Sequence, residues 1–258
     1  MRLVPLNNAT GHNAPFNFVV SAGMQKAGST LLHEYCKALV RHQHGAAGQR
    51  AFEGWIQTGP VGGSGSFAWD PWVNHVPALC DLAAQHGPFV LKTHAPYPHL
   101  AAAVDHRAIR TVFIHRDPRD AVLSALDHGA RSRAAGDWPY AECVDIASTL
   151  PLVQKWCAGA VTWRGAPGVL CFRYEDLVGN TRAEVSRLAA FLGLPEPGKV
   201  AAAIIAQECA ERQRGRNQFN KGAVCRWPQE MTTAQRAECE HGLAPWIRDL
   251  GYELADGR

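Results

Sequence analysis

The chain has 258 residues, 47% of them hydrophobic and 19% charged, which is the composition of a globular protein large enough for one α/β domain. Its 26 basic and 23 acidic side chains leave a formal charge of +3. This small excess excludes the dense basic surface of a protein that binds nucleic acids or membranes, so binding must depend on local sites.

The cysteines and the N-terminus bear on the cellular compartment. The eight cysteines include no CxxC pair, and most lie in apolar segments such as VLCFRY, so we expect reduced core residues. The N-terminal MRLVPLNNATG lacks the basic start and apolar stretch of a signal peptide, and no later segment reaches the roughly 18 apolar residues that a membrane span needs. These features favour a cytoplasmic protein.

The chain begins with the pattern of a strand, a loop and a helix. FNFVVSA, residues 16–22, is a β-branched run that predicts a buried strand, and residues 29–42 carry apolar side chains at helical spacing. Residues 44–88 are rich in glycine, proline and aromatic residues, and only residues 76–85 resemble a helix. Long irregular segments of this kind commonly bind ligands, so we expect a binding region there.

The rest of the chain alternates strands with helices. Further strands are predicted at residues 89–94, 109–115 and 168–175. Helices are predicted after the cap Asp117, over 140–163 with an interruption at Pro151, over 181–194, from there to about 212, and after a threonine cap near the C-terminus. This alternation predicts one three-layer α/β/α domain with a central parallel sheet and no internal repeat or linker.

A parallel sheet binds its ligand beyond the carboxyl ends of its strands, where four polar clusters lie. The first is GMQKAGST, in which Lys26 precedes Gly28, whereas the nucleotide loop GxxxxGK[ST] has its lysine after the second glycine. The backbone amides of residues 27–30 would still face an anion at the start of a helix. The alternative is an ordinary turn with a surface lysine.

The second cluster is LKTHAPYP, where Lys92 and His94 point to the same side of a strand and suggest a charge stabiliser beside a general base. Taken alone, His94 would more often be a structural histidine.

The third cluster is HRDPRDAVLSAL, in which Arg116 and Ser124 could bind a second anion. The alternative pairs Arg116 with Asp117 or Asp120 on the surface. The fourth is QFNKGAVCRWPQEMT, whose Lys221 and Gly222 could close over a phosphate or belong to a solvated basic loop.

Taken in order, these clusters resemble the nucleotide-dependent sulfotransferases, which use 3'-phosphoadenosine 5'-phosphosulfate as sulfuryl donor. GMQKAGSTLL is similar to the family's 5'-phosphosulfate loop PKSGTT, in which lysine precedes glycine, and HRDPRDAVLSAL is similar to its 3'-phosphate segment. KTH, FRYEDL, KGAVCRW and APWIRDLGYE resemble further family segments in the expected order. The resemblance covers residues 16–254 and is weakest over 44–88.

The resemblance implies a P-loop nucleotide-binding fold in which residues 1–258 form a single sulfotransferase domain. Residues 44–88 would be the acceptor-binding region, and 213–231 a loop that closes over the donor. The chain departs from the family pattern at Gln25, Leu31, Asn220, Cys225 and Arg226, where the family commonly has proline, tryptophan, arginine, glycine and aspartate. Leu31 offers no aromatic face to adenine, which leaves the adenine contact open, and Arg216 is a candidate for a replaced 3'-phosphate contact.

The activity implied is in-line transfer of a sulfuryl group to a hydroxyl or amine of a small molecule, with adenosine 3',5'-bisphosphate as product and no metal required. Lys26 would neutralise the leaving oxygen, Lys92 the sulfuryl oxygens, and His94 would take the acceptor's proton. The implied donor-binding residues are Lys26, Ala27, Gly28, Ser29, Thr30, Arg116, Ser124, Tyr174, Asn220, Lys221 and Gly222. The expected acceptor-binding residues are Trp55, Phe67, Trp69, Trp72 and His75.

Two other functions stay open at this point. One is a P-loop kinase-like phosphotransferase, which the position of Lys26 and the lack of a strand ending in a magnesium-binding aspartate disfavour. The other is a non-catalytic nucleotide-binding module. We expect a small-molecule acceptor as partner, with no nucleic acid and no membrane, and the sequence leaves a homodimer open.

Overall fold

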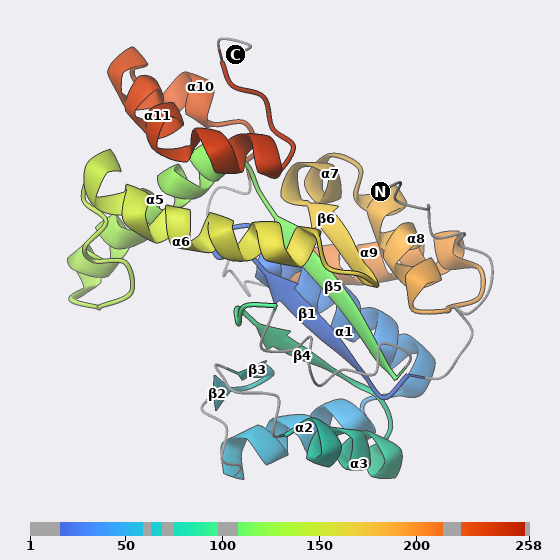
Figure 1. The fold of residues 1–258 in the computed structure, drawn as a ribbon. Coiled ribbons are helices and arrows are strands. Elements are labelled where there is room, and N and C mark those ends of the chain that lie inside the picture. The colour runs from blue at the N-terminus through green and yellow to red at the C-terminus, as the bar shows by residue number, and fades with distance from the viewer. Residues whose placement is uncertain (1–15, 59–62, 69–74, 98–107, 214–222, 256–258) are drawn as a thin grey trace, which may run out of the picture.

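A computed structural model of the protein describes residues 16–58, 63–68, 75–97, 108–213 and 223–255 (Figure 1). Its centre is a sheet of six strands in the order β2-β3-β4-β1-β5-β6. The strands are β1 (Phe18–Gly23), β2 (Gly63–Ser64), β3 (Phe67–Ala68), β4 (Phe89–Thr93), β5 (Ile109–His115) and β6 (Val169–Arg173). Every neighbouring pair is parallel except β2 with β3, so the sheet is mostly parallel, as predicted.

Helices cover both faces of the sheet (Figure 1). They are α1 (Ser29–His44), α2 (Ala47–Thr58), α3 (Val76–His86), α5 (Pro118–Ala135), α6 (Ile146–Arg164), α7 (Tyr174–Gly179), α8 (Thr181–Phe191), α9 (Pro197–Gln213), α10 (Trp227–Glu230) and α11 (Thr233–Asp249). Along β1, Phe18 and Val20 face a core formed with α2, α3, α5, α6 and α11, whereas Val19 faces a second core formed with α1, α8 and α9. Because alternate side chains enter different cores, the domain has the predicted three layers.

The predicted helix starts agree with the structure at two caps. Asp117 accepts a hydrogen bond from the backbone N–H of Arg119 at 2.9 Å, with Pro118 at the first helical position of α5. Thr232 and Gln235 form a reciprocal capping box at the start of α11. These caps direct α5 away from the carboxyl end of β5 and start the C-terminal helix.

The described residues between 44 and 88 are more regular than predicted. The prediction missed α2, although its apolar residues Phe52, Trp55 and Ile56 lie at helical spacing, because two glycines lie within the helix and glycine and proline follow it in the sequence. Gly48 is needed there because a Cβ would lie 2.1 Å from the carbonyl oxygen of Gly87. The prediction also missed the short β2–β3 pair, which extends the sheet beyond β4.

The predicted helix over 140–163 was wrong at its start and at Pro151. Asp145 caps α6, which begins at Ile146, so the residues from Tyr140 to the cap precede the helix. Pro151 lies in the second turn of a continuous helix. It removes one backbone hydrogen bond without ending the helix, because the neighbouring bonds and the buried face remain.

The cysteines agree only in part with the expected core placement. Cys36, Cys143, Cys157 and Cys239 are buried, and every described cysteine is free. Cys225 is exposed, which corrects the expectation at this position. It follows Ala223 and Val224 in the segment that precedes α10.

Candidate active site

The loop between β1 and α1 presents the start of a helix without a cap. Helix α1 has neither a side-chain cap nor an acidic residue in its first turn. The backbone N–H groups of its first residues, Ser29 to Leu31, therefore have no intrahelical acceptor and carry the positive end of the helix dipole. This arrangement suits an anion. The predicted set of amides began at Ala27, but the Ala27 N–H donates to the carbonyl oxygen of Met24 at 3.2 Å.

Gly28 fixes the shape of this loop. Its φ of 79° lies in the left-handed region, and a Cβ would lie 2.4 Å from Cδ2 of Tyr174. Both facts require glycine. Tyr174 also packs under Arg116, with 4.6 Å between the guanidinium carbon and the ring centroid. One aromatic ring thus joins the two predicted anion-binding segments.

Lys26 lies at the tip of the same loop with a φ of 63°. Its Nζ lies 2.9 Å from Nδ1 of His128 and 5.2 Å from the ring centroid of Tyr140. The pKa of Lys26 is lowered to about 8, chiefly by burial. The positive charge of Arg131 also lowers this pKa, and its effect is larger than the opposite effect of Asp127. The ammonium is thus held in a partly buried, positively charged environment.

Lys92 and His94 lie against the two ends of the loop. Lys92 Nζ donates to Oγ1 of Thr30 at 2.7 Å, and His94 Nδ1 lies 2.6 Å from the carbonyl oxygen of Gly23. A carbonyl only accepts, so His94 carries its proton on Nδ1 and leaves Nε2 as a free acceptor. Burial lowers the pKa of His94 to about 4 and that of Lys92 to about 8, so at neutral pH the imidazole is uncharged.

Arg116 is buried and partly engaged. Its Nη2 donates to Oδ2 of Asp120 at 2.9 Å and to the carbonyl oxygen of Ala223 at 2.6 Å. Pairing with Asp120 was the alternative considered from the sequence, but the pair lies in the interior and not on the surface. Nε of Arg116 is buried without a partner among the described residues. Ser124 lies two turns along α5 and is also buried.

The segment before α10 is fixed on α5. Oδ1 of Asp120 accepts from the backbone N–H groups of Arg226 and Trp227 at 2.9 and 3.0 Å. The Arg226 guanidinium pairs with Asp127 at 2.8 Å and with Glu230 at 2.7 Å. Arg226 therefore anchors this segment.

Several predicted donor contacts cannot be placed. Asn220, Lys221, Gly222 and Arg216 lie outside the described residues. The side chain of Leu31 is buried in the core on one face of α1, so it is not exposed at the loop where adenine would need a contact.

The predicted acceptor residues separate into two groups. The rings of Phe67 and His94 lie 5.4 Å apart, which places Phe67 beside the candidate base. Trp55 and His75 instead contact each other, with 5.9 Å between their rings. Trp69 and Trp72 lie outside the described residues.

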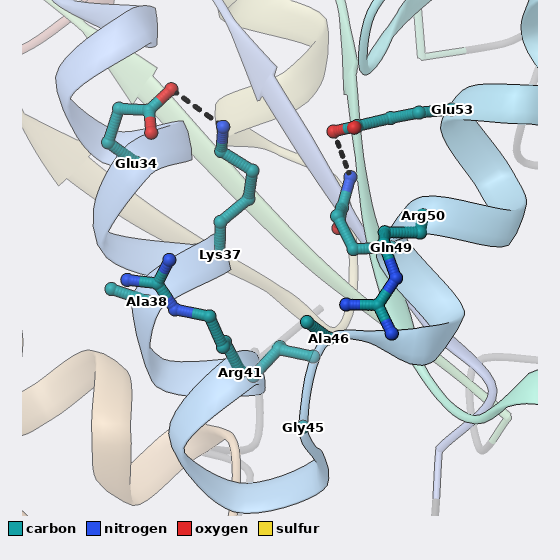
Figure 2. A pocket seen from close by; sticks show the side chains of 10 residues that line it. Glu34, Lys37, Ala38, Arg41, Gly45, Ala46, Gln49, Arg50 and Glu53 are labelled. Carbon is teal, nitrogen blue, oxygen red and sulfur yellow. Dashed lines mark hydrogen bonds and ion pairs between the residues drawn. The ribbon is translucent and has the colours of Figure 1, made fainter.

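A separate pocket of about 210 Å³ lies between α1 and α2. Figure 2 shows the Glu34–Lys37 ion pair of α1 and the Gln49–Glu53 hydrogen bond of α2 on its two sides. None of the predicted catalytic residues lines this pocket. Gln49 has a structural task, because its amide bonds both the N–H and the C=O of Val90 and thereby completes the pairing of β4.

The comparisons with known proteins identify the family. The model of the family described as "Sulfotransferase domain" matches residues 18–251, nearly the whole chain. The chain belongs to this sulfotransferase family.

Two curated relatives illustrate the distance within the family. Human Sulfotransferase 2B1 is 21% identical over 226 residues, which cover 76% of this chain and 59% of that protein. Cytosolic sulfotransferase 15 of Arabidopsis thaliana is 24% identical over 231 residues, which cover 80% of this chain and 60% of that protein. The chain thus spans about three fifths of the length of these relatives.

Solved sulfotransferase structures share the fold. Retinol dehydratase in complex with androsterone and the inactive cofactor PAP matches with a TM-score of 0.58 at 16% identity, over 95% of this chain and 85% of that chain. Mouse sulfotransferase SULT7A1 complexed with PAP matches with a TM-score of 0.59 at 15% identity, over 90% and 84%.

Some contacts of this sulfotransferase domain were not predicted from the sequence. Asp120 binds the backbone of the segment before α10, and His128 and Tyr140 contact Lys26. Within the described ranges, no cluster of His, Cys, Asp and Glu has the geometry of a metal site, and no helix is long and apolar enough to cross a membrane.

Proposed function

We propose that this protein is a sulfotransferase that uses 3'-phosphoadenosine 5'-phosphosulfate as donor and a hydroxyl or amine of a small molecule as acceptor. The observation that carries the proposal is the arrangement of two lysines and one uncharged histidine around the loop that leads into the uncapped start of α1: Lys26 lies in the loop, Lys92 contacts Thr30, and His94 contacts Gly23. The family and the PAP-bound structural neighbours support the choice of donor.

The residues of the site fit such a donor. The first-turn amides of α1 offer N–H groups to a 5'-phosphosulfate, and the buried Nε of Arg116, unpartnered in the described part of the chain, offers a donor for a 3'-phosphate. Ser124 and Tyr174 border the same region, and Asn220, Lys221 and Gly222 are proposed to complete it. Because Asp120 neutralises Arg116, hydrogen-bond geometry must contribute much of the affinity at this end.

When bound, the donor supplies an electrophilic sulfur whose bond to the 5'-phosphate oxygen breaks as the bond to the acceptor forms. His94 takes the acceptor's proton on Nε2, because its Nδ1–H is held by Gly23. Lys92, oriented by Thr30, and Lys26 place positive charge where negative charge develops. These roles need no metal ion.

The acceptor is proposed to be a small molecule with a ring or another apolar part. Phe67 beside His94 supplies an apolar surface next to the base, and we propose Trp55, Trp69, Trp72 and His75 as further contacts. A cytoplasmic location and a homodimer stay predictions.

The test combines ligand binding with turnover. Adenosine 3',5'-bisphosphate without metal should raise the unfolding temperature of the purified protein, and ATP with magnesium should have little effect. Labelled donor should then transfer sulfonate to members of a panel of phenols, alcohols, amines and saccharides, detected by mass spectrometry. Stabilisation by ATP with magnesium alone would favour a kinase, and binding without any transfer would favour a non-catalytic module.

A further inference from the structure

We propose that His128 and Tyr140 hold the Lys26 ammonium in the donor-free protein and release it to the donor. The identity of the donor rests on the proposed function, but the contact itself does not. His128 and Tyr140 thereby become positioning residues for Lys26, which neither the family resemblance nor the sequence pattern assigned.

The geometry defines the chemistry of the contact. An ammonium has no lone pair, so Lys26 donates to Nδ1 of His128 at 2.9 Å, and His128 must be neutral with its hydrogen on Nε2. The ring of Tyr140 lies 5.2 Å from the same ammonium and 4.6 Å from the ring of His128. One hydrogen bond and one cation–π contact therefore hold the charge.

Tyr140 is itself fixed by a residue that departs from the family pattern. Its hydroxyl donates to Oε1 of Gln25 at 2.8 Å, and its ring packs edge-on against Trp156 at 5.7 Å. Proline, which the family commonly has at position 25, could not accept this bond. Gln25 and Lys26 are adjacent, so one short loop carries both the held lysine and the group that fixes its aromatic partner.

Backbone strain is concentrated at the same contact. Lys26 and Tyr140 have φ values of 63° and 64°, in the left-handed region that residues other than glycine rarely adopt. Such conformations cost energy and persist where surrounding contacts determine them, commonly at ligand-binding sites. The contacts of Lys26 with His128 and Tyr140 are contacts that keep both residues in these conformations.

The surrounding charges explain why an anion would draw Lys26 away. The ionisable side chains near Lys26 are Arg131, Arg116, Asp127 and Cys143. Those near His128, besides Lys26 itself, are Arg131 and Asp137. Burial and these cations lower the pKa of both Lys26 and His128. A doubly charged phosphosulfate at the start of α1 would offer the ammonium a stronger partner than a neutral imidazole.

Competitive acetylation of lysines tests the holding step without any turnover. Trace labelled acetic anhydride is applied to the folded protein at pH 7, and peptide mass spectrometry gives the relative rate at each lysine. His128→Ala and Tyr140→Leu should each raise the rate at Lys26 several-fold, because the first removes the hydrogen-bond acceptor and the second removes the ring, and both contacts favour the charged form of the amine. Lys92 and the exposed Lys199 are internal references, and His86→Ala on the exposed end of α3 is the matched control.

An unchanged Lys26 rate in both folded variants would overturn the proposal. The release step is tested by calorimetry with adenosine 3',5'-bisphosphate at pH 7. Binding to His128→Ala should be roughly two- to tenfold tighter than to the unmodified protein, since no hydrogen bond has to be broken first. Unchanged or weaker binding would overturn the release. If the unmodified protein bound no bisphosphate, the proposed function would fail, whereas the acetylation result would still decide whether His128 holds Lys26.

Discussion

Asp120 binds Arg116 with one carboxylate oxygen, at 2.9 Å, and the backbone of residues 226 and 227 with the other. It is fully buried, and Arg116 is nearly so. One side chain thus orients a proposed phosphate-binding arginine and fixes the start of α10 on α5. Asp120 thus connects the proposed donor site to the C-terminal part of the domain.

Replacing Asp120 should therefore lower the stability of the folded protein. Asp120→Ala leaves Arg116 as a buried unpaired charge and leaves two N–H groups without an acceptor, so we expect a loss of about 3–5 kcal/mol in the free energy of unfolding. Urea denaturation followed by tryptophan fluorescence measures it. Asp120→Asn keeps one acceptor oxygen and should lose less. A loss below about 1 kcal/mol for the alanine variant would show that the contacts of Asp120 are not needed for the stability of the fold.

Arg116 should matter mainly for donor binding. Arg116→Ala removes the unpaired Nε and the contact with Ala223, so the dissociation constant of adenosine 3',5'-bisphosphate should rise by about tenfold or more, as expected for a charge-assisted hydrogen bond. Arg116→Lys keeps the charge but not the planar fork, and we expect it to restore only part of the affinity. Calorimetry on both variants provides the measurement, and an unchanged constant in the alanine variant excludes this role.

Much of the framework was predictable because it depends on local patterns. The largely apolar runs of β1, β4, β5 and β6 are short and continuous, and the cap at Asp117 has a strong local signal. Helix α2 was missed although Phe52, Trp55 and Ile56 lie at helical spacing, because Gly48 and Gly54 within the segment are typical of a loop.

The candidate site was predictable in its residues more than in its contacts. Lys26 lies in the loop between β1 and α1, and Lys92 and His94 contact Thr30 and Gly23 at the two ends of that loop. Their catalytic roles stay predictions. The partners of Lys26 lie about a hundred positions away along the chain, at His128 and beyond. No spacing rule links such residues, because only the tertiary fold, in which α5 packs against α6 and α11, brings them together.

His94 should determine the turnover rate and its dependence on pH. His94→Ala removes the proton acceptor, so kcat should fall by roughly a hundredfold or more with the fold intact, and the exposed His42→Ala should retain the full rate. The pKa of His94 is lowered to about 4, so the base is already uncharged at pH 6 and activity should not rise between pH 6 and 7.5. Steady-state rates over this range provide the check, and near-normal turnover by the alanine variant would contradict the assignment.

The two active-site lysines should make activity fall at high pH. Their pKa values are lowered to about 8, chiefly by burial, so each loses its charge as the pH rises through that value in the donor-free protein. The kcat/KM for donor should therefore decline above about pH 8, whereas kcat should decline at a higher pH because a bound anion favours the charged amines. A profile that stays flat to pH 10 for both constants would show that neither lysine titrates in this range.

Lys92 should carry a cost in stability. Its pKa is lower in the folded protein than in the unfolded chain, so the folded state binds fewer protons between about pH 8 and 10.5, and stability should rise across that window. Lys92→Met removes the buried charge, and we expect it to raise the denaturation midpoint at pH 7 while it reduces turnover. The difference between the two proteins should shrink at pH 10. Equal midpoints at pH 7 would mean that burial of this ammonium is compensated, for example by Thr30.

Gly28 provides the sharpest test of the loop itself, because any Cβ there meets two obstacles. It would lie 2.4 Å from the Tyr174 ring, and the backbone has a φ of 79°. Gly28→Ala should lower the free energy of unfolding by about 1–3 kcal/mol and weaken bisphosphate binding, since the loop must move from the start of α1. Gly54→Ala is a matched control with the opposite sign, because Gly54 is exposed on α2 with no atom near its Cβ position and alanine favours a helix by about 0.5–1 kcal/mol. If both variants were equally stable, the close packing of Tyr174 on the loop would be wrong, and with it the link between the loop and Arg116.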